Sequence, residues 1–316
     1  MPATAAAPAD ERPPATAEEL KELAERLERL LRIRTLPIGL KHFETMAAME
    51  AVPGLRRPRP GRAFTTCQLV TQARVAGLTI GIAHENVRPN SNCGGIIGLN
   101  VPGEDYLSGK KLAGVWFADQ ENARKHQETM PRVPAGRFVG LVCAPLRAGR
   151  LDPPDICLFY GTPGQTILFV NGLQHRRYRR YDMSITGESA CADGWGKALA
   201  TKDTAISIPC YAERRYGGVA DDELLVACPP EEFRRGVEGL EALAKVGLRY
   251  PIPPYGAHMD PAEGMDVSYG AEGKRAPATP ASAAPPVSAA PPVSAESAAA
   301  RRPPRSAPQR RPRRPA

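Results

Sequence analysis

The sequence lacks any apolar run of membrane-spanning length. Its longest runs, such as Phe138–Leu146 and Thr166–Val170, are less than half as long as the roughly 20 residues that cross a bilayer as a helix. The first segment, Met1–Thr16, is rich in alanine and proline and has no basic stretch followed by an apolar one. We therefore expect no membrane contact and no secretory signal, and we predict a cytoplasmic protein.

Signatures of several common enzyme classes are also absent. The chain has neither GxGxxG nor GxxxxGKS/T, so no nucleotide phosphate loop is indicated, and neither GxSxG nor HExxH occurs. Seven cysteines are present, but no two of them have C-x-x-C spacing. An odd number of widely spaced cysteines in 316 residues does not form a disulfide scaffold. It indicates buried thiols, metal ligands or reactive groups.

The positive charge is confined to the end of the chain. The formal net charge is +8, and residues 274–316 hold nine basic residues and one acidic residue, so residues 1–273 are balanced. This balance disfavours a basic domain that coats DNA. We predict a disordered leader (1–15), a globular body (16–272) and a disordered basic tail rich in alanine, proline and arginine (273–316). The tail is either a solubility segment or a weak, salt-sensitive contact for an acidic protein or nucleic acid.

Short strands alternate with helices along the body, which predicts an α/β or α+β fold in a single compact sheet-and-helix body. Thr16 and Glu19 form a capping box ahead of a leucine stripe, so a first helix begins there. Further helices are predicted at 66–75, near 119–130, from Thr162-Pro163 and from Pro230. The predicted strands are 38–43, 78–82, 138–142, 156–160, 183–186, 204–208 and 224–227.

Two parts of the chain follow the same order around cysteine. Residues 67–93 contain a cysteine, a helical segment, a strand and a second cysteine, and residues 191–210 repeat that order. Each part is followed by a strand with a further cysteine, Cys143 in the first case and Cys228 in the second. The residue identity is low, so coincidence is one interpretation. The other is a body of two related halves whose four lead cysteines converge across a pseudo-two-fold axis.

The four lead cysteines differ in their predicted surroundings. Cys67 and Cys191 fall at helix N-termini, where the helix dipole favours a thiolate, whereas Cys93 and Cys210 fall in loops after strands. Gly94-Gly95 would let the backbone approach a bulky group closely. Four thiolates from separate segments are the usual ligands of an iron–sulfur cluster or, alternatively, of zinc. Packed inert thiols and a reactive nucleophile are the other two interpretations.

Arg214 and Arg215 follow Cys210 closely and are candidates for binding a carboxylate or phosphate of a cofactor. The alternative is that the two arginines pair with Asp221 and Asp222.

Several segments resemble the bacterial and archaeal family called domain of unknown function 169. The matching segments are FTTCQLVTQARVAG (64–77), NCGGIIGL (92–99), ACADGWGKAL (190–199) and IPCYAERRYGGVADDELLV (208–226), within a resemblance that covers about 18–247. The family's recurrent positions include Cys67, Arg74, Cys93, Gly94, Gly95, Cys191, Cys210 and Gly217. Two departures are Gly94, where the family commonly has proline, and the absence of a further cysteine soon after Cys210.

The resemblance supports the fold and the choice of cysteines, and it leaves the reaction open. Cys143, Cys157 and Cys228 lie on apolar strands and are expected in the core. We expect a metal protein in which Cys67, Cys93, Cys191 and Cys210 hold an iron–sulfur cluster for electron transfer or redox chemistry with a redox partner. The alternatives are a metal-free thiol enzyme and a binding module for a small molecule or macromolecule whose cysteines are structural.

Overall fold

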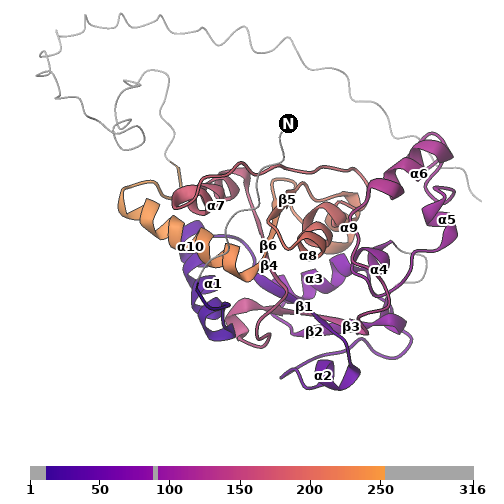
Figure 1. The fold of residues 1–316 in the computed structure, drawn as a ribbon, viewed down its shortest axis with the longest axis horizontal. Helices are drawn as coiled ribbons and strands as arrows, with labels where there is room; N and C mark the ends of the chain where they lie inside the picture. Colours follow the sequence, from indigo (N-terminus) through magenta and orange to yellow (C-terminus); the bar gives the residue numbers. More distant parts are fainter. Residues whose placement is uncertain (1–11, 88–91, 253–316) are drawn as a thin grey trace, which may run out of the picture. The chain divides into compact units, whose positions relative to one another are not determined.

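Six strands form one sheet in the computed structural model, which describes residues 12–87 and 92–252 (Figure 1). The strands are β1 (Ile38–Phe43), β2 (Ile80–Ala83), β3 (Gly140–Pro145), β4 (Ile156–Gly161), β5 (Ala205–Ser207) and β6 (Leu224–Cys228). They lie in the order β2-β3-β1-β4-β6-β5, and every neighbouring pair is antiparallel. The prediction of a mixed sheet-and-helix body is confirmed, and the antiparallel sheet makes it α+β.

Side chains on these strands alternate between two buried faces. On β4, Leu158 and Tyr160 face one apolar cluster, whereas Cys157 and Phe159 face another. The remaining strands are also buried almost throughout. Because helices cover both faces, the strand sequences are nearly continuous apolar runs rather than alternating polar and apolar residues.

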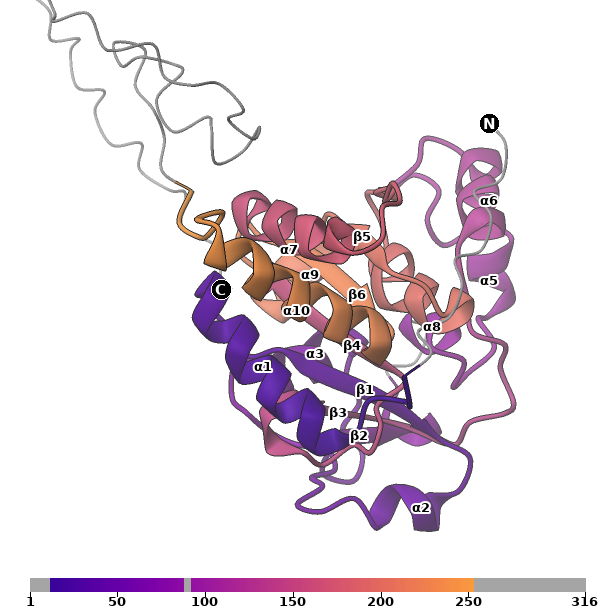
Figure 2. The ribbon, with the colours of Figure 1, turned by 60° about the vertical axis from the view of Figure 1, so that its left-hand side comes forward.

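Three long helices cover one face of the sheet and lie side by side (Figure 2). They are α1 (Ala17–Leu31), α7 (Pro163–His175) and α10 (Pro230–Lys245). Each begins as predicted: the Thr16 side chain accepts a hydrogen bond from the Glu19 amide, and proline stands at the first turn of α7 and of α10. The Glu19 carboxylate pairs with Arg234 on α10 rather than completing the capping box.

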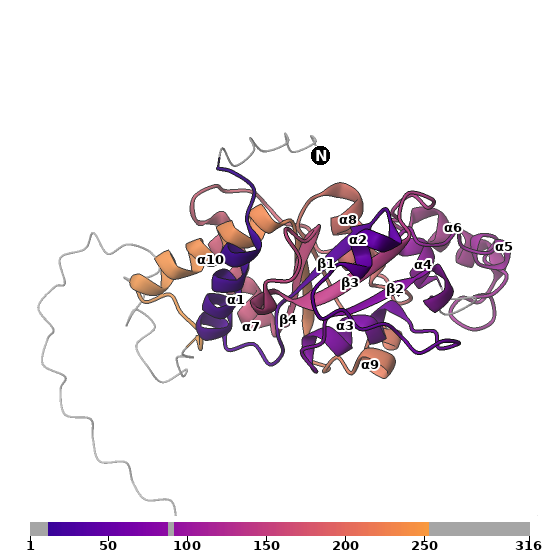
Figure 3. The same cartoon turned by 90° about the horizontal axis from the view of Figure 1, so that it is seen from below.

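The opposite face carries shorter helices, among which α3 and α9 lie side by side (Figure 3). This layer consists of α3 (Thr66–Arg74), α4 (Cys93–Ile96), the π-helix η3 (Ala192–Gly196), α8 (Lys197–Thr201) and α9 (Tyr211–Gly217). The remaining helical segments are α2 (Met46–Glu50), α5 (Glu104–Leu107), α6 (Gln120–Thr129), η1 (His84–Asn86) and η2 (Leu146–Ala148). Figure 1 places α5 and α6 together, far from α1 and α10.

The strand order has the symmetry that the cysteine repeat predicts. In each half the first strand (β1 or β4) is central, the third (β3 or β6) is next to it, and the second (β2 or β5) is at the edge. The two central strands pair with each other around Gly39 and Cys157. Each half also places one helix with a cysteine at its start before the edge strand and another such helix after it. The order of elements therefore repeats even though the residue identity is low.

Two predictions differ from the structure. The predicted strand 183–186 is reduced to an isolated bridge between Met183 and Ile206. Residues 12–15, assigned to the leader, lie against α10, where Arg234 donates hydrogen bonds to the Pro13 carbonyl and Ala15 is buried. The remainder of the leader (1–11), the end of the predicted body (253–272) and the tail (273–316) lie outside the described residues.

Candidate functional site: a cavity lined by four cysteines

Cys67, Cys93, Cys191 and Cys210 line one cavity of about 510 Å³ on the face of the sheet that carries α3 and α9. These cysteines come from four different segments of the chain, two in each half of the sheet. The sequence-based expectation that they lie together is thus met by the fold. The other three cysteines are completely buried on strands, as expected: Cys143 faces the same apolar cluster, and Cys157 and Cys228 face the opposite one.

Each of the four cysteines stands at the beginning of a helix. Cys67 is the second residue of α3, whose start is fixed by a capping box between Thr65 and Gln68. Cys93 is the first residue of α4, and Cys191 and Cys210 immediately precede η3 and α9. The loop position predicted for Cys210 is confirmed, because this residue has an extended backbone between β5 and α9, whereas the loop position predicted for Cys93 is wrong, because Cys93 begins a short helix. All four sulfurs thus lie close to backbone N–H groups at helix starts.

The thiols contact one another, and Cys93 is at the centre. Its pKa lies well below the ordinary value, because the thiols of Cys191 and Cys67 both hydrogen-bond to its sulfur. The same hydrogen bonds, together with burial, raise the pKa of Cys67 and of Cys191 well above the ordinary value. Burial, and after it the Glu213 carboxylate, raises the pKa of Cys210 to about 11. Of the three contacting thiols, Cys93 is therefore the one that its surroundings favour as a thiolate.

A buried carboxylate lies beneath the thiols. Glu213 on α9 accepts hydrogen bonds from the Tyr160 hydroxyl at 3.1 Å and from the Cys210 amide at 3.1 Å. Burial raises the pKa of Glu213 to about 6, although these two hydrogen bonds act in the opposite direction. Its charge also contributes to the raised pKa values of Cys67 and Cys191. Glu213 thus couples the ionisation of the thiols to that of a carboxyl group.

Arg74 connects the two helices that carry Cys67 and Cys210. Its guanidinium stacks 4.3 Å from the Tyr160 ring, lies 3.5 Å from the Glu223 carboxylate and donates to the carbonyls of Gly217 and Gly218 at the end of α9. Its side chain is only 2% exposed, and that of Glu223 is 4% exposed. A fully buried arginine with these partners fixes α9 against α3.

Close contact at Gly217 has the same effect. The Thr71 hydroxyl of α3 lies 2.6 Å from the Gly217 carbonyl, to which it donates, and a Cβ at Gly217 would come within 3.4 Å of the Cys67 Cβ. The nearest atom to that Cβ would be the Thr71 Oγ1 at 3.2 Å, so a side chain at position 217 would press on α3 one turn after Cys67.

Aromatic residues surround the mouth of the cavity. Trp116 and Tyr211 meet edge to face with ring centroids 5.7 Å apart, and Tyr216 and Tyr106 complete the aromatic lining. The first three remain 45%, 55% and 42% exposed. Such amphipathic rings, exposed beside a cavity, are typical of surfaces that bind a ligand or a partner.

A carboxylate also lines this cavity. Glu188 is paired with His126 on α6 at 3.0 Å and accepts a hydrogen bond from the Ser189 hydroxyl at 2.6 Å. Ser189 adopts a left-handed backbone with φ of 55°, a conformation that a serine rarely takes. Because strained residues of this kind cluster at functional sites, the segment that leads into Cys191 belongs to the candidate site.

The chain is similar to a known family along this whole region. A model of domain of unknown function 169, described as uncharacterised ArCR, matches residues 26–239. The chain belongs to this family. The match includes the six strands and all four cavity cysteines. The uncharacterized protein MJ0308 of Methanocaldococcus jannaschii is 27% identical over 187 residues, which cover 57% of this chain and 77% of the relative. No solved structure matches the chain.

The lining of the four-cysteine cavity does not include the residues that were predicted to contact a cofactor, namely Gly94, Gly95, Arg214 and Arg215. Gly94 packs against Val87 and Asn100, and Gly95 packs so closely against Pro102 that a Cβ would lie 2.3 Å from the proline ring. The Gly95 amide donates to the Asn92 carbonyl. The two glycines thus have a packing reason that the sequence did not reveal.

The two arginines are engaged in contacts on α9. Arg214 donates to the Ala220 carbonyl at 2.6 Å and lies 3.5 Å from Asp221, as the alternative interpretation expected. Arg215 donates to the Tyr211 hydroxyl. Neither arginine lines the cavity. The charged residues in its lining are Lys111 and Glu188.

Sequence reasoning missed three features of the site, namely Glu213, Tyr160 and the aromatic residues around Trp116. Glu213 stands next to Arg214 in the sequence, and its position three residues after Cys210 is the capping-box spacing that could have identified it. Tyr160 and Trp116 carry no comparable local signal, because β4 and the segment before α6 reach the cavity only through the fold.

Across 12–87 and 92–252, no group of three or more His, Cys, Asp and Glu side chains is placed so that it could hold a metal ion as it stands. Within the same ranges, every helix is too short or too polar to cross a bilayer.

Proposed function

We propose that the four-cysteine cavity binds an iron–sulfur cluster and that the protein works in electron transfer or redox chemistry. The observation that carries the proposal is that four cysteines from four helix starts line one cavity. Cysteine thiolates are the standard ligands of such clusters, and no other residue type is required. When bound, a cluster would supply one-electron transfer.

The surroundings of the four sulfurs support a cluster with a negative charge. Helix starts next to all four cysteines offer N–H groups that stabilise thiolates. Cys93 already favours the thiolate form. Because Cys67, Cys93 and Cys191 now hydrogen-bond to one another, metal binding would replace these contacts and displace the thiol protons.

The aromatic mouth supports an exchange of electrons with a partner. Trp116, Tyr211 and Tyr216 are exposed at the opening, so a partner that contacts them would come close to the sulfurs without any need for the body to unfold. Interfaces of this kind are enriched in exposed tyrosine and tryptophan.

A second candidate function, thiol chemistry without metal, is favoured by one specific observation. The Cys93 thiolate lies in hydrogen-bond contact with two thiols, as a nucleophilic cysteine and a resolving cysteine do. The Cys93 thiolate would attack an acceptor disulfide and displace one of its sulfurs, and Cys191 would then attack Cys93 in the mixed disulfide and displace the other. One S–S bond forms for the one that breaks, two electrons pass to the acceptor, and the Cys191 proton moves to the acceptor, which leaves as one thiol and one thiolate.

The deciding experiment is analysis of iron, zinc and acid-labile sulfide in protein purified without oxygen, together with its visible spectrum. We expect iron and sulfide in similar amounts and a broad visible absorbance. Serine at Cys67, Cys93, Cys191 or Cys210 should remove both. The matched control is Cys143→Ala, which removes a buried thiol outside the cavity and should keep iron and sulfide.

Three outcomes would contradict the cluster. Iron that persists after all four cysteines are replaced would place the metal elsewhere. Stoichiometric zinc without sulfide would indicate a single-ion site instead. Protein without metal that forms a disulfide between Cys93 and a neighbouring cysteine would favour the second function.

A further inference from the structure

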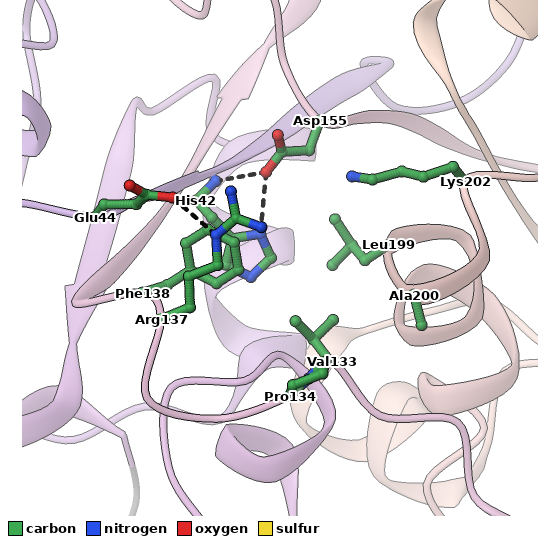
Figure 4. A pocket seen from close by; sticks show the side chains of 10 residues that line it. All are labelled: His42, Glu44, Val133, Pro134, Arg137, Phe138, Asp155, Leu199, Ala200 and Lys202. Carbon is green, nitrogen blue, oxygen red and sulfur yellow. Dashed lines mark hydrogen bonds and ion pairs between the residues drawn. The ribbon is translucent and has the colours of Figure 1, made fainter.

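A second cavity of about 530 Å³ lies at the end of β1, and it shares no lining residue with the four-cysteine cavity (Figure 4). Its lining comes from the end of β1, the segment that leads into β3, the residue just before β4 and the end of α8. Nothing in the sequence patterns singled out this place, because its residues are distant from one another along the chain.

A histidine–aspartate pair forms one wall. The His42 amide and the His42 Nδ1 both lie within hydrogen-bond distance of Asp155 Oδ2, at 2.8 and 3.0 Å, and His42 Nε2 lies 2.8 Å from the Ile97 carbonyl. The ring stacks on Phe138 with centroids 4.4 Å apart, and its side chain is only 3% exposed. Since both ring nitrogens are engaged, the part of the pair that remains available to a ligand is the carboxylate.

The two oxygens of Asp155 have different surroundings. Oδ2 accepts a hydrogen bond from the His42 amide and lies 3.0 Å from His42 Nδ1, whereas Oδ1 receives none from any residue that the structure describes. Figure 4 shows Oδ1 turned away from the histidine. Hydrogen bonds from His42 hold the pKa of Asp155 below its ordinary value against the effect of burial. Asp155 is therefore a fixed carboxylate with one acceptor oxygen to spare.

A lysine extends toward this carboxylate from the other side (Figure 4). Lys202 ends α8 in a left-handed conformation with φ of 55°, at a position where helices usually have glycine. Its charge contributes to the lowered pKa of Asp155, although the hydrogen-bond contacts of Asp155 are with His42. The Lys202 side chain is exposed and lines the cavity, so its amine is available to a ligand.

The remaining walls are mainly apolar. Val133, Pro134 and Leu199 line the cavity together with the Phe138 ring. Arg137 and Glu44 also line it, at its exposed side, where Arg137 Nε lies 2.8 Å from Glu44 and the two side chains are 72% and 59% exposed. Next to this exposed pair, the cavity offers one carboxylate oxygen, one ammonium group and an apolar wall.

We propose that this cavity binds an α-amino acid with an apolar side chain. The ligand's ammonium group would donate to Asp155 Oδ1, its carboxylate would bind the Lys202 amine, and its side chain would pack on Val133, Leu199 and Phe138. A zwitterion pairs with both charges at once, whereas a simple carboxylate or a simple amine pairs with only one of them.

The test is isothermal titration of the full chain with L-leucine, L-methionine and L-phenylalanine. Two comparison ligands, 4-methylpentanoate and 3-methylbutylamine, keep the apolar group of leucine but carry only one of its charges. We expect at least one amino acid to bind and both comparison ligands to bind more weakly, by about ten- to a hundredfold, as the loss of one charge-assisted hydrogen bond predicts.

Two variants separate binding from folding. In Asp155→Asn the amide oxygen can replace Oδ2 toward His42, while an NH₂ group replaces the free acceptor, so binding should weaken about ten- to a hundredfold with little change in melting temperature. Lys202→Gly removes the amine at a position where glycine suits the backbone, so binding should weaken while stability is kept. Arg34→Met removes an exposed ion pair with Asp222 outside both cavities, so it serves as the control and should bind as the wild type does.

Three results would contradict amino-acid binding in this cavity. The proposal is overturned if none of the three amino acids binds, if binding is unchanged in both Asp155→Asn and Lys202→Gly, or if 4-methylpentanoate binds as tightly as leucine. None of these results depends on whether the four cysteines hold a cluster.

Discussion

Replacing Arg74 by methionine should destabilise the protein strongly and loosen the four-cysteine cavity. Methionine retains most of the apolar stem of arginine but removes the guanidinium, which contacts Glu223, Thr35 and the carbonyls at the end of α9. The Glu223 carboxylate, only 4% exposed, would then lack its cationic partner.

The magnitude follows from the geometry. Two unit charges 3.5 Å apart attract each other by roughly 5 kcal/mol at an effective dielectric constant of 20. The cost of burying both charges offsets much of that attraction, but removal of one partner leaves the other buried and unpaired, which costs about 3–5 kcal/mol. We expect a loss of this size in the free energy of unfolding for Arg74→Met. The double variant with Glu223→Gln should lose less than the sum of the two single variants.

Urea unfolding measures these differences, with Arg34→Met as the matched control. Arg34 pairs with Asp222, the neighbour of Glu223, but both side chains are about half exposed, so this change should alter stability little. Alkylation of native Cys210 should become faster in Arg74→Met, because α9 loses the contacts that hold it against α3. Arg74→Met with wild-type stability and an unchanged Cys210 alkylation rate would refute the reasoning.

Three further predictions concern the Glu213 carboxyl group, the packing of α7 on α10 and the reactivity of Cys93. Burial raises the pKa of Glu213 from 4.5 to about 6 in the folded state, so the native state binds this proton more tightly than the unfolded state does. The resulting contribution to the free energy of unfolding is about 2 kcal/mol. It is fully present below pH 4.5 and is lost as the pH rises through 6. Urea unfolding of Glu213→Gln should lack this decline; parallel pH profiles of variant and wild type would contradict it. Gly172→Ala should lower the melting temperature, at a cost of about 1–3 kcal/mol, because the added Cβ would lie 2.3 Å from a backbone carbonyl of α10. The control, Gly164→Ala on the same helix, has room for a Cβ and should keep the wild-type melting temperature. Equal melting temperatures for the two variants would show that α7 and α10 can move apart freely. In metal-free protein Cys93 should be alkylated first at neutral pH, and Cys143, whose pKa burial raises, should react only on unfolding; mass spectrometry that finds equal rates would disprove the thiolate assignment.

The sequence by itself determined the features that depend on near neighbours. The starts of α1, α3 and α7 follow from Thr16, Thr65 and Thr162, each of which accepts a hydrogen bond from an amide three residues on. Such contacts form within one turn, so they can be recognised without knowledge of the rest of the fold. The same holds for the buried strands, whose apolar runs require two covered faces.

The repeated order of cysteine, helix and strand was also readable in the sequence, and the strand order reproduces it. What the sequence could not provide was the detail at Cys93, which begins a four-residue helix rather than lying in a loop. A helix of four residues has little intrinsic stability, and packing decides whether it forms.

Only the tertiary structure decided which side chains meet. Tyr160 and Glu213 are 53 residues apart, Arg74 and Gly217 are 143 apart, and His42 and Asp155 are 113 apart. Such pairs arise where β1 and β4 meet at the centre of the sheet and where α9 packs on α3. Local propensity carries no information about these distances, because the chain between the partners can take many paths. Packing selects one of them, and it brings the thiols together in one cavity and sets an aspartate opposite a lysine in the other.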